Sequence, residues 1–272
     1  MERNKQRIVV KVGTSTLTHE SGAVDLRNME RLVRVLCDLS GAGHEIILVT
    51  SGAIAVGTAK LGLAERPREL RMKQAAAAVG QCRMMHIYDK FFSEYNRSMA
   101  QILLTGDDVE DPERAKHLRG TFSALLELGV IPVVNENDSV SSAEIETGHH
   151  KVLGDNDTLS AIVAELCQAD LLVLLSDIDG LYDADPKQNP NARLLYQVKE
   201  LTPEILEKAG GAGTWRGTGG MATKLAAARI AMAAGCDMVI TNGSRVEDLY
   251  GIVEGKNIGT RFFAAAQEEE PI

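Results

Sequence analysis

The stretch Ile8-Val9-Val10-Lys11-Val12-Gly13-Thr14-Ser15 gives the clearest indication of the fold class. Its β-branched residues predict a strand that ends at Gly13. The segments Ile46-Ile47-Leu48-Val49 and Leu171-Leu172-Val173-Leu174-Leu175 are apolar throughout in the same way. Strands of this kind are typical of a parallel sheet, because helices cover both of its faces.

Helical patterns separate these runs. Met29, Leu32 and Leu36 recur at three- and four-residue steps, and the segment 41–43, Gly-Ala-Gly, ends that helix. Further strands are predicted at 100–104, 130–134 and 238–241, and helices at 112–128, 158–167 and 221–234, with one helix or a broken pair over 69–95. The alternation predicts an α/β fold, a mostly parallel open sheet between layers of helices.

Composition excludes several classes of protein. The 272 residues carry 29 Lys and Arg against 38 Asp and Glu, a net charge of −9, which argues against a dedicated binder of nucleic acid or of anionic membranes. No apolar run approaches the roughly 20 residues that a membrane helix needs. The start of the chain is polar and contains no signal peptide, so we expect a cytoplasmic protein.

The four cysteines, Cys37, Cys82, Cys167 and Cys236, contain no C-x-x-C pair. A zinc or disulfide framework is therefore not expected, and all four are predicted to be buried or semi-buried free thiols.

Small and polar residues follow the predicted strands and precede the predicted helices. They form six clusters, at 11–15, 50–53, 135–138, 154–157, 176–177 and 217–224. Ligands of open α/β sheets bind beyond the carboxyl ends of the strands, where glycines and helix N-termini admit phosphate groups. A single cluster of this kind is more often an ordinary turn, but six together predict a ligand site.

The glycine-rich segment before the last predicted helix does not fit a P-loop, which requires G-x-x-x-x-G-K-[ST]. The spacing of Gly217, Gly219 and Ala222 fits the dinucleotide pattern G-x-G-x-x-A, which alone is a weak signal. Lys224 near a helix N-terminus is unfavourable unless an anion lies between them, which indicates bound phosphate. Lys11, in an apolar strand, is either exposed at a sheet edge, part of a structural ion pair, or directed at an anion.

Six short segments are distinctive: Val-Lys-Val-Gly-Thr-Ser at 10–15, Thr-Ser-Gly-Ala at 50–53, Asn-Glu-Asn-Asp at 135–138, Gly-Asp-Asn-Asp at 154–157, Asp-Gly-Leu-Tyr at 179–182 and Gly-Thr-Gly-Gly-Met-Ala-Thr-Lys at 217–224. Together they resemble the amino acid kinase family, in particular its glutamate 5-kinases. The resemblance runs from about residue 7 to about residue 262. It implies ATP-dependent phosphorylation of the γ-carboxylate of L-glutamate, the first step of proline biosynthesis.

The resemblance also implies the roles of individual residues. Lys11 and Lys224 would be cations at the transfer site, held in place by Asp157. Glutamate would bind at Ser51, Asp138 and Asn156. The nucleotide would contact Lys11, Ser176, Asp177, Thr218, Gly219, Gly220, Met221, Ala222, Thr223 and Lys224. Position 176 is often Thr in the family, and Ser keeps the hydroxyl.

The resemblance suggests one amino acid kinase domain over 1–272, with an acceptor lobe at about 1–170, a nucleotide lobe at about 171–264 and an acidic tail at 265–272. Many bacterial members carry a C-terminal RNA-binding-like domain of the PUA type, which this chain is expected to lack. Family members also suggest a homo-oligomer and feedback inhibition by proline.

The expected chemistry needs no general base. A γ-carboxylate has an ordinary pKa of about 4.3 and is already a nucleophile at neutral pH. Mg²⁺ would bridge the nucleotide phosphates, with no metal site of the protein itself, and His149-His150 is interpreted as a loop tip. The polar segment Ser141 to Lys151 is predicted to be a flap over glutamate. Only one of Asp155 and Asp157 can cap the helix that follows, which leaves the other for a different task.

Other functions remain open from the sequence. One is another carboxylate or phosphate kinase of the same fold, acting on acetylglutamate, aspartate or a uridylate, although the Asn-Glu-Asn-Asp segment argues against these. A regulatory amino-acid-binding module would not need both lysines. An oxidoreductase domain that binds a nicotinamide cofactor depends only on the weak glycine pattern.

Overall fold

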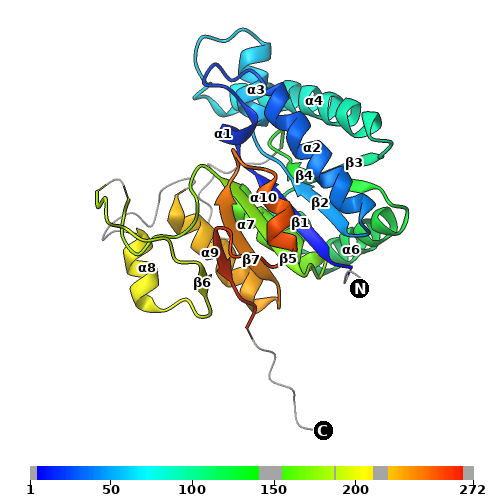
Figure 1. The fold of residues 1–272 in the computed structure, drawn as a ribbon. Helices are drawn as coiled ribbons and strands as arrows, with labels where there is room; N and C mark the ends of the chain where they lie inside the picture. Colours follow the sequence, from blue (N-terminus) through cyan, green and yellow to red (C-terminus); the bar gives the residue numbers. More distant parts are fainter. Residues whose placement is uncertain (1–4, 141–154, 187, 211–219, 266–272) are drawn as a thin grey trace.

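The fold is built around one sheet of eight strands (Figure 1). The computed structural model describes residues 5–140, 155–186, 188–210 and 220–265. The strands are β1 (Arg7–Val12), β2 (Glu45–Val49), β3 (Met99–Leu104), β4 (Ile131–Glu136), β5 (Leu171–Ser176), β6 (Gln197–Val198), β7 (Asp237–Asn242) and β8 (Thr260–Phe262). Their order is β3-β4-β2-β1-β5-β7-β8-β6, and every neighbouring pair is parallel except β7 and β8. This confirms the predicted α/β fold.

Helices lie on both sides of the sheet (Figure 1). They are α1 (Thr14–Leu17), α2 (Leu26–Gly41), α3 (Ala53–Lys60), α4 (Leu70–Glu94), α5 (Gly106–Glu110), α6 (Pro112–Glu127), α7 (Asn156–Leu166), α8 (Pro203–Gly210), α9 (Met221–Ala233) and α10 (Asp248–Val253). The Ala-rich stretch that could have been one helix or two is the single helix α4.

Side-chain alternation divides the core between the two faces of the sheet. Val10 and Val12 pack with α2, α4 and α10, whereas Val9 packs on the other side with α6, α7 and α9. Strand β1 lies between β2 and β5, so Lys11 is in the centre of the sheet and not at an edge. Alternation therefore places Lys11 on the face that α7 and α9 cover.

Helices α3 and α4 approach each other unusually closely at two glycines. A Cβ atom on Gly57 of α3 would lie 1.8 Å from the carbonyl oxygen of Ala76, and one on Gly80 of α4 would lie 1.8 Å from that of Ala53. Neither position therefore accepts a side chain.

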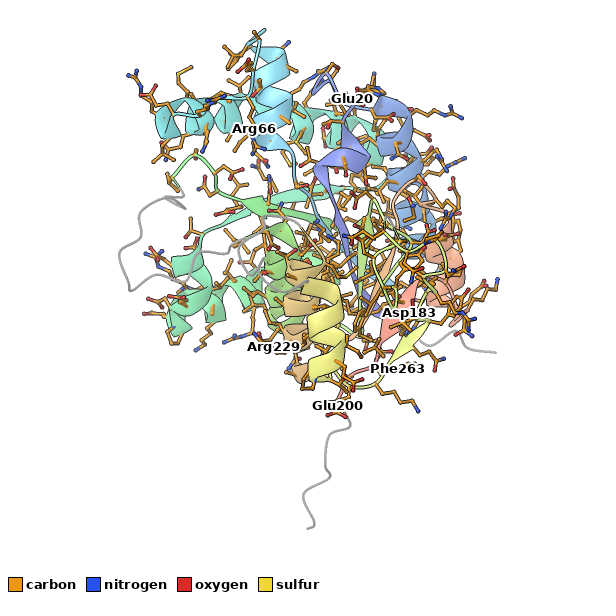
Figure 2. All side chains as sticks on the ribbon, turned by 90° about the vertical axis from the view of Figure 1, so that its left-hand side faces the viewer. Glu20, Arg66, Asp183, Glu200, Arg229 and Phe263 are labelled. Atoms are coloured by element: carbon orange, nitrogen blue, oxygen red, sulfur yellow. The ribbon has the colours of Figure 1, made fainter. Side chains whose placement is uncertain are left out.

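Figure 2 shows Arg66, in the connection between these helices, toward one end of the molecule, and Arg229 of α9 and Glu200 toward the other.

Several short elements carry no clear sequence signal. Strands β6 and β8 have two and three residues, too few for a periodic pattern.

Helix α2 ends close to where the glycines predict, and Gly43 adopts φ +101°, a left-handed conformation that suits glycine. No helix in the described part of the chain is long and apolar enough to cross a bilayer.

The prediction for the cysteines needs one correction. All four are free thiols, and Cys37, Cys167 and Cys236 are buried, but Cys82 is exposed. Cys82 lines the open cavity between α4 and the ends of β3 and β4, whereas its neighbours Gln81, Met84 and Met85 on the helix are buried.

Candidate active site

The centre of the candidate site is one carboxylate between two lysines. Lys11 Nζ lies 2.6 Å from Asp157 Oδ1, and Lys224 Nζ lies 3.2 Å from Asp157 Oδ2. The three residues come from β1, α7 and α9, and they are 146 and 67 positions apart in sequence (157 − 11 and 224 − 157). Asp157 is 2% exposed and Lys224 is 5% exposed. The cluster has a net charge of +1 in a nearly buried setting.

Local structure explains why Asp157 is available for this contact. Asp155 caps α7, since its Oδ1 accepts hydrogen bonds from the backbone N–H groups of Asp157 and Thr158 at 2.7 and 2.9 Å. The cap thus belongs to Asp155, and the side chain of Asp157 is directed to the lysines. Lys224 is in the first turn of α9, where the helix dipole disfavours a cation and Asp157 offsets that cost.

The two aspartates respond in opposite directions to this environment. Burial alone would raise the pKa of Asp157, but the ammonium groups of Lys11 and Lys224 outweigh it and hold the pKa below its ordinary value. Burial raises the pKa of Asp155, whose hydrogen bonds from the α7 backbone compensate only in part. Asp157 therefore stays ionised between its two partners.

Thr223 adds a hydroxyl to the same cluster. Its Oγ1 lies 3.2 Å from Asp157 Oδ2 and 2.8 Å from the backbone carbonyl of Gly220. These contacts tie the first turn of α9 to the first turn of α7. The start of α9 is thereby fixed relative to the end of β1.

Ser51 lies at the carboxyl end of β2, close to the end of β1. Its Oγ donates a hydrogen bond to the carbonyl of Val12 at 3.1 Å and lies 3.2 Å from Thr14 Oγ1. Gly52, with φ +97°, turns the chain from β2 into α3. This left-handed turn requires glycine and places Ser51 beside the N-termini of two helices, α1 and α3.

Asn156 belongs to a buried chain of amide groups. Its Nδ2 donates to the carbonyl of Thr50 at 2.5 Å and to Asn135 Oδ1 at 3.1 Å. Asn135 Nδ2 in turn donates to Gln81 Oε1 at 2.9 Å. The chain links β2, β4, α4 and α7 beneath the ends of the strands.

A cavity of about 330 Å³ opens between α4 and the ends of β3 and β4. Gln81, Glu136 and Asp138 line it, and no lysine or arginine is among the described residues of its lining. Burial, together with the negative charge of Glu136, raises the pKa of Asp138 to about 6, while Arg66 acts in the opposite direction. An ammonium group would relieve this excess of negative charge.

Apart from Lys11 on β1, the described residues that are predicted to bind the nucleotide lie at the carboxyl end of β5 and at the start of α9. Ser176 is buried and donates to Asp177 Oδ1 at 3.1 Å, and Asp177 is exposed. Gly220, Met221 and Ala222 precede Thr223 and Lys224 at the beginning of α9. Some of the predicted residues lie outside the described part of the chain. These are Thr218, Gly219, the segment Ser141 to Lys151 with His149-His150, and the tail from residue 266.

The structure thus brings Lys11, Asp157 and Lys224 together, and Ser51 and Asn156 border the same strand ends. The distances do not test what each residue does, so the roles stay predictions. The residues that sequence reasoning missed are Thr14, Asn135 and Gln81. The first two lie inside quoted motifs and could have been named. Gln81 could have been found only as a polar residue on an otherwise apolar face of a helix.

Comparison with known proteins identifies the family. The family model described as "Amino acid kinase family" matches residues 6–242. The chain belongs to the amino acid kinase family. Similar members are the glutamate 5-kinase of Clostridium perfringens, 53% identical over 98% of this chain and 98% of its own length, and that of Listeria monocytogenes, 49% identical over 98% and 96%. That of Carboxydothermus hydrogenoformans is 53% identical over 98% of this chain and 70% of its own length. The predicted family resemblance is confirmed, and this amino acid kinase is an enzyme.

Solved structures of more distant kinases have the same fold. Carbamate kinase from Giardia lamblia bound to AMP-PNP has a TM-score of 0.65 at 17% identity and covers 97% of this chain and 99% of its own. Isopentenyl phosphate kinase in a substrate complex has a TM-score of 0.63 at 19% identity, over 94% and 99%. At these identities the likeness concerns the fold of this amino acid kinase alone.

Proposed function

We propose that this amino acid kinase is a glutamate 5-kinase, which transfers the γ-phosphoryl group of ATP to the γ-carboxylate of L-glutamate and begins proline biosynthesis. The observation that carries the proposal is the contact of both Lys11 and Lys224 with the single carboxylate of Asp157. The high identity to glutamate 5-kinases along nearly the whole chain supports the choice of acceptor.

The proposed reaction joins two anions. An oxygen of the γ-carboxylate attacks the γ-phosphorus, the bond from phosphorus to the ADP oxygen breaks, and no proton is transferred. Because the carboxylate is ionised at neutral pH, the enzyme has only to align the groups and to oppose their negative charge. Lys11 would stabilise the transferred group from the side of the acceptor and Lys224 from the side of ADP, while Asp157 keeps both ammonium groups at fixed positions.

Asp138, Asn156 and Ser51 would hold glutamate. The carboxylate of Asp138 suits the α-ammonium group, since the described residues that line its cavity include two acidic ones and no basic one. The Ser51 hydroxyl already donates its hydrogen to Val12, so its oxygen and the amide oxygen of Asn156 would both accept hydrogen bonds from the acceptor molecule. On the donor side, Ser176, Asp177 and residues 218–224 would contact ATP.

Magnesium would arrive with the nucleotide. Within the residues that the structure describes, no three His, Cys, Asp or Glu side chains are grouped to hold a metal ion. Mg²⁺ is commonly held by substrate phosphates and water with few protein ligands, so the site is compatible with it. When bound, the ion neutralises phosphate charge. The lysines of the cluster would still be needed, because they face the phosphoryl group that moves.

Trapping the product with hydroxylamine tests the proposed function. An acyl phosphate reacts with hydroxylamine to give a hydroxamate, so we expect ATP- and Mg²⁺-dependent formation of γ-glutamyl hydroxamate. The same assay with N-acetylglutamate and aspartate should give little product, and a uridylate should not be phosphorylated. Preference for one of these acceptors would favour another member of the family, and no turnover with any of them would favour a regulatory module.

Several further expectations accompany this proposal. Proline would compete at the glutamate site as an end-product inhibitor, the enzyme would form a homo-oligomer, and it would act in the cytoplasm on small molecules without nucleic acid or membrane. The acceptor lobe at about 1–170 and the nucleotide lobe at about 171–264 would each bind one substrate. The expectations about the cytoplasm, nucleic acid and membranes come from the composition and the polar start of the chain, and the others come from the resemblance to the family.

A further inference from the structure

Gln81 is a buried polar residue with one clear task. It is 8% exposed on α4, and its Oε1 accepts the hydrogen bond from Asn135 Nδ2 at 2.9 Å. Within the described residues, its Nε2 has no hydrogen-bond partner. A buried amide is costly unless its hydrogen bonds are made, so this arrangement depends on the single bond that Gln81 accepts.

The direction of the amide chain is fixed from its other end. The carbonyl of Thr50 only accepts hydrogen bonds, so Asn156 must present its Nδ2 to it. The same Nδ2 also faces Asn135, which must therefore present Oδ1 to Asn156 and Nδ2 to Gln81. Gln81 is the last member of this chain, and its Oε1 accepts the hydrogen bond that Asn135 Nδ2 donates.

This polarity leaves the oxygen of Asn156 available. Both hydrogens on Asn156 Nδ2 are used within the protein, and no described residue donates to its Oδ1. Without Gln81, Asn135 would have a buried N–H with no acceptor and could rotate its amide. Asn156 would then lose the partner that holds its own amide in one orientation.

Together these contacts assign to Gln81 the task of a positioning residue: through Asn135 it orients Asn156 so that the Asn156 amide oxygen faces the amino-acid acceptor. This inference rests on the proposed function, in which Asn156 contacts glutamate. Gln81 also lines the cavity of Asp138, and the inference assigns its effect to the orientation of Asn156 and to no contact with the reacting atoms. Its effect is therefore expected on the binding of glutamate and not on the binding of ATP.

Gln81→Met tests the inference, since methionine has a similar volume and makes no such hydrogen bond. We expect the KM for glutamate to rise about tenfold, the effect of one lost buried hydrogen bond, with kcat and the KM for ATP within about twofold of wild type. A merely structural role would instead lower the melting temperature and the active fraction, and would leave the KM for glutamate unchanged. Lys90→Met, at an exposed position on the same helix and outside the lining of the cavity, is the control.

A double-mutant cycle shows whether Gln81 acts through Asn156. In the background of Asn156→Ala, adding Gln81→Met should raise the KM for glutamate by less than about twofold, because the residue to be oriented is gone. Full tenfold rises in both backgrounds would overturn the inference, as would an unchanged KM in Gln81→Met. If the wild type gives no γ-hydroxamate at all, the proposed function itself fails.

A second substitution keeps the test decisive should Gln81→Met fold poorly. Asn135→Leu removes the middle of the amide chain without adding a charge to the cavity, so the KM for glutamate should rise about tenfold, as in Gln81→Met. An unchanged KM for glutamate in folded Asn135→Leu would contradict the inference.

Discussion

The Asp157 carboxylate holds two ammonium groups that neither neighbour in sequence nor share an element. The carboxylate offsets the repulsion between the two ammonium groups, which would be strong in a nearly buried space without an anion between them. The remaining charge of +1 is available to an anion that binds at the carboxyl end of β1 and the start of α9.

Replacing either lysine should therefore affect turnover more than stability. We expect Lys11→Ala and Lys224→Ala each to lower kcat about 10²- to 10³-fold, the usual cost of removing one preorganised charge from a reacting group. The hydroxamate assay measures this, and thermal unfolding checks that both variants fold. Lys256→Ala, which removes a lysine whose side chain is 66% exposed, is the matched control and should retain full activity. Wild-type turnover in either active-site variant would refute the assignment.

In the proposed function, Asp138 would make the use of glutamate depend on pH. Its pKa is raised to about 6, by burial first and then by Glu136, so it is protonated below about pH 6 in the free enzyme. A protonated Asp138 does not pair with the α-ammonium group, and the ammonium itself does not titrate in this range. We expect kcat/KM for glutamate to fall about tenfold per pH unit below pH 6, with KM for ATP much less affected. Asp138→Asn should have a low kcat/KM without this inflection, and an unchanged inflection would contradict the prediction.

The contact between α3 and α4 depends on the absence of side chains at two positions. Gly57 and Gly80 let the two helices approach until backbone meets backbone. Helix α3 begins just after Ser51 and α4 carries Gln81, so this contact also sets the distance between two parts of the proposed acceptor site.

A single methyl group should disrupt that contact. Gly80→Ala and Gly57→Ala each place a Cβ 1.8 Å from a carbonyl oxygen, which the helices can relieve only by moving apart. We expect a loss of about 3 kcal/mol or more in the free energy of unfolding, at the upper end for overpacking, measured by denaturant titration. Gly120→Ala on α6, where nothing lies within 4 Å, is the control and should gain about 0.5–1 kcal/mol. A neutral Gly80→Ala would contradict this description.

How far the elements follow from the sequence depends on their length and burial. Strands β1, β2 and β5 and helices α2 and α9 have long enough apolar patterns to be predicted within a few residues. The pairing of β8 with β7 and β6 is not predictable, because Thr260–Phe262 contains no alternation long enough to recognise.

The site was predictable in its residue types and not in its contacts. Lys11 and Lys224 stood out because a cation in an apolar strand or at a helix N-terminus needs an anion. Both lysines contact the carboxylate of Asp157 because β1, α7 and α9 pack together at this point. No local sequence pattern specifies how these three elements pack. Gln81 was missed because its hydrogen-bond partner Asn135 is 54 positions away in the sequence.

The four thiols report on the integrity of the whole chain. Burial raises the pKa of Cys37 to about 11 and of Cys167 and Cys236 to about 12, so these three resist alkylation until the protein opens. We expect one equivalent of a thiol reagent to react rapidly with the native enzyme, at Cys82, and four equivalents in denaturant. Cys82→Ser should abolish the rapid phase and leave three slow thiols. A second rapid thiol in the native wild type would show that one of the two core layers is open.

The antiparallel direction of β8 determines where the described chain ends. Since β8 runs opposite to the parallel strands, it carries the chain away from their carboxyl ends, and the backbone N–H of Ala265 bonds to the carbonyl of Met232 near the end of α9. Helix α9 has 13 residues and so spans about 20 Å from the candidate site to that point. An affinity tag or reporter protein fused behind Ala265 would accordingly emerge on the side remote from both substrates and leave catalysis unobstructed.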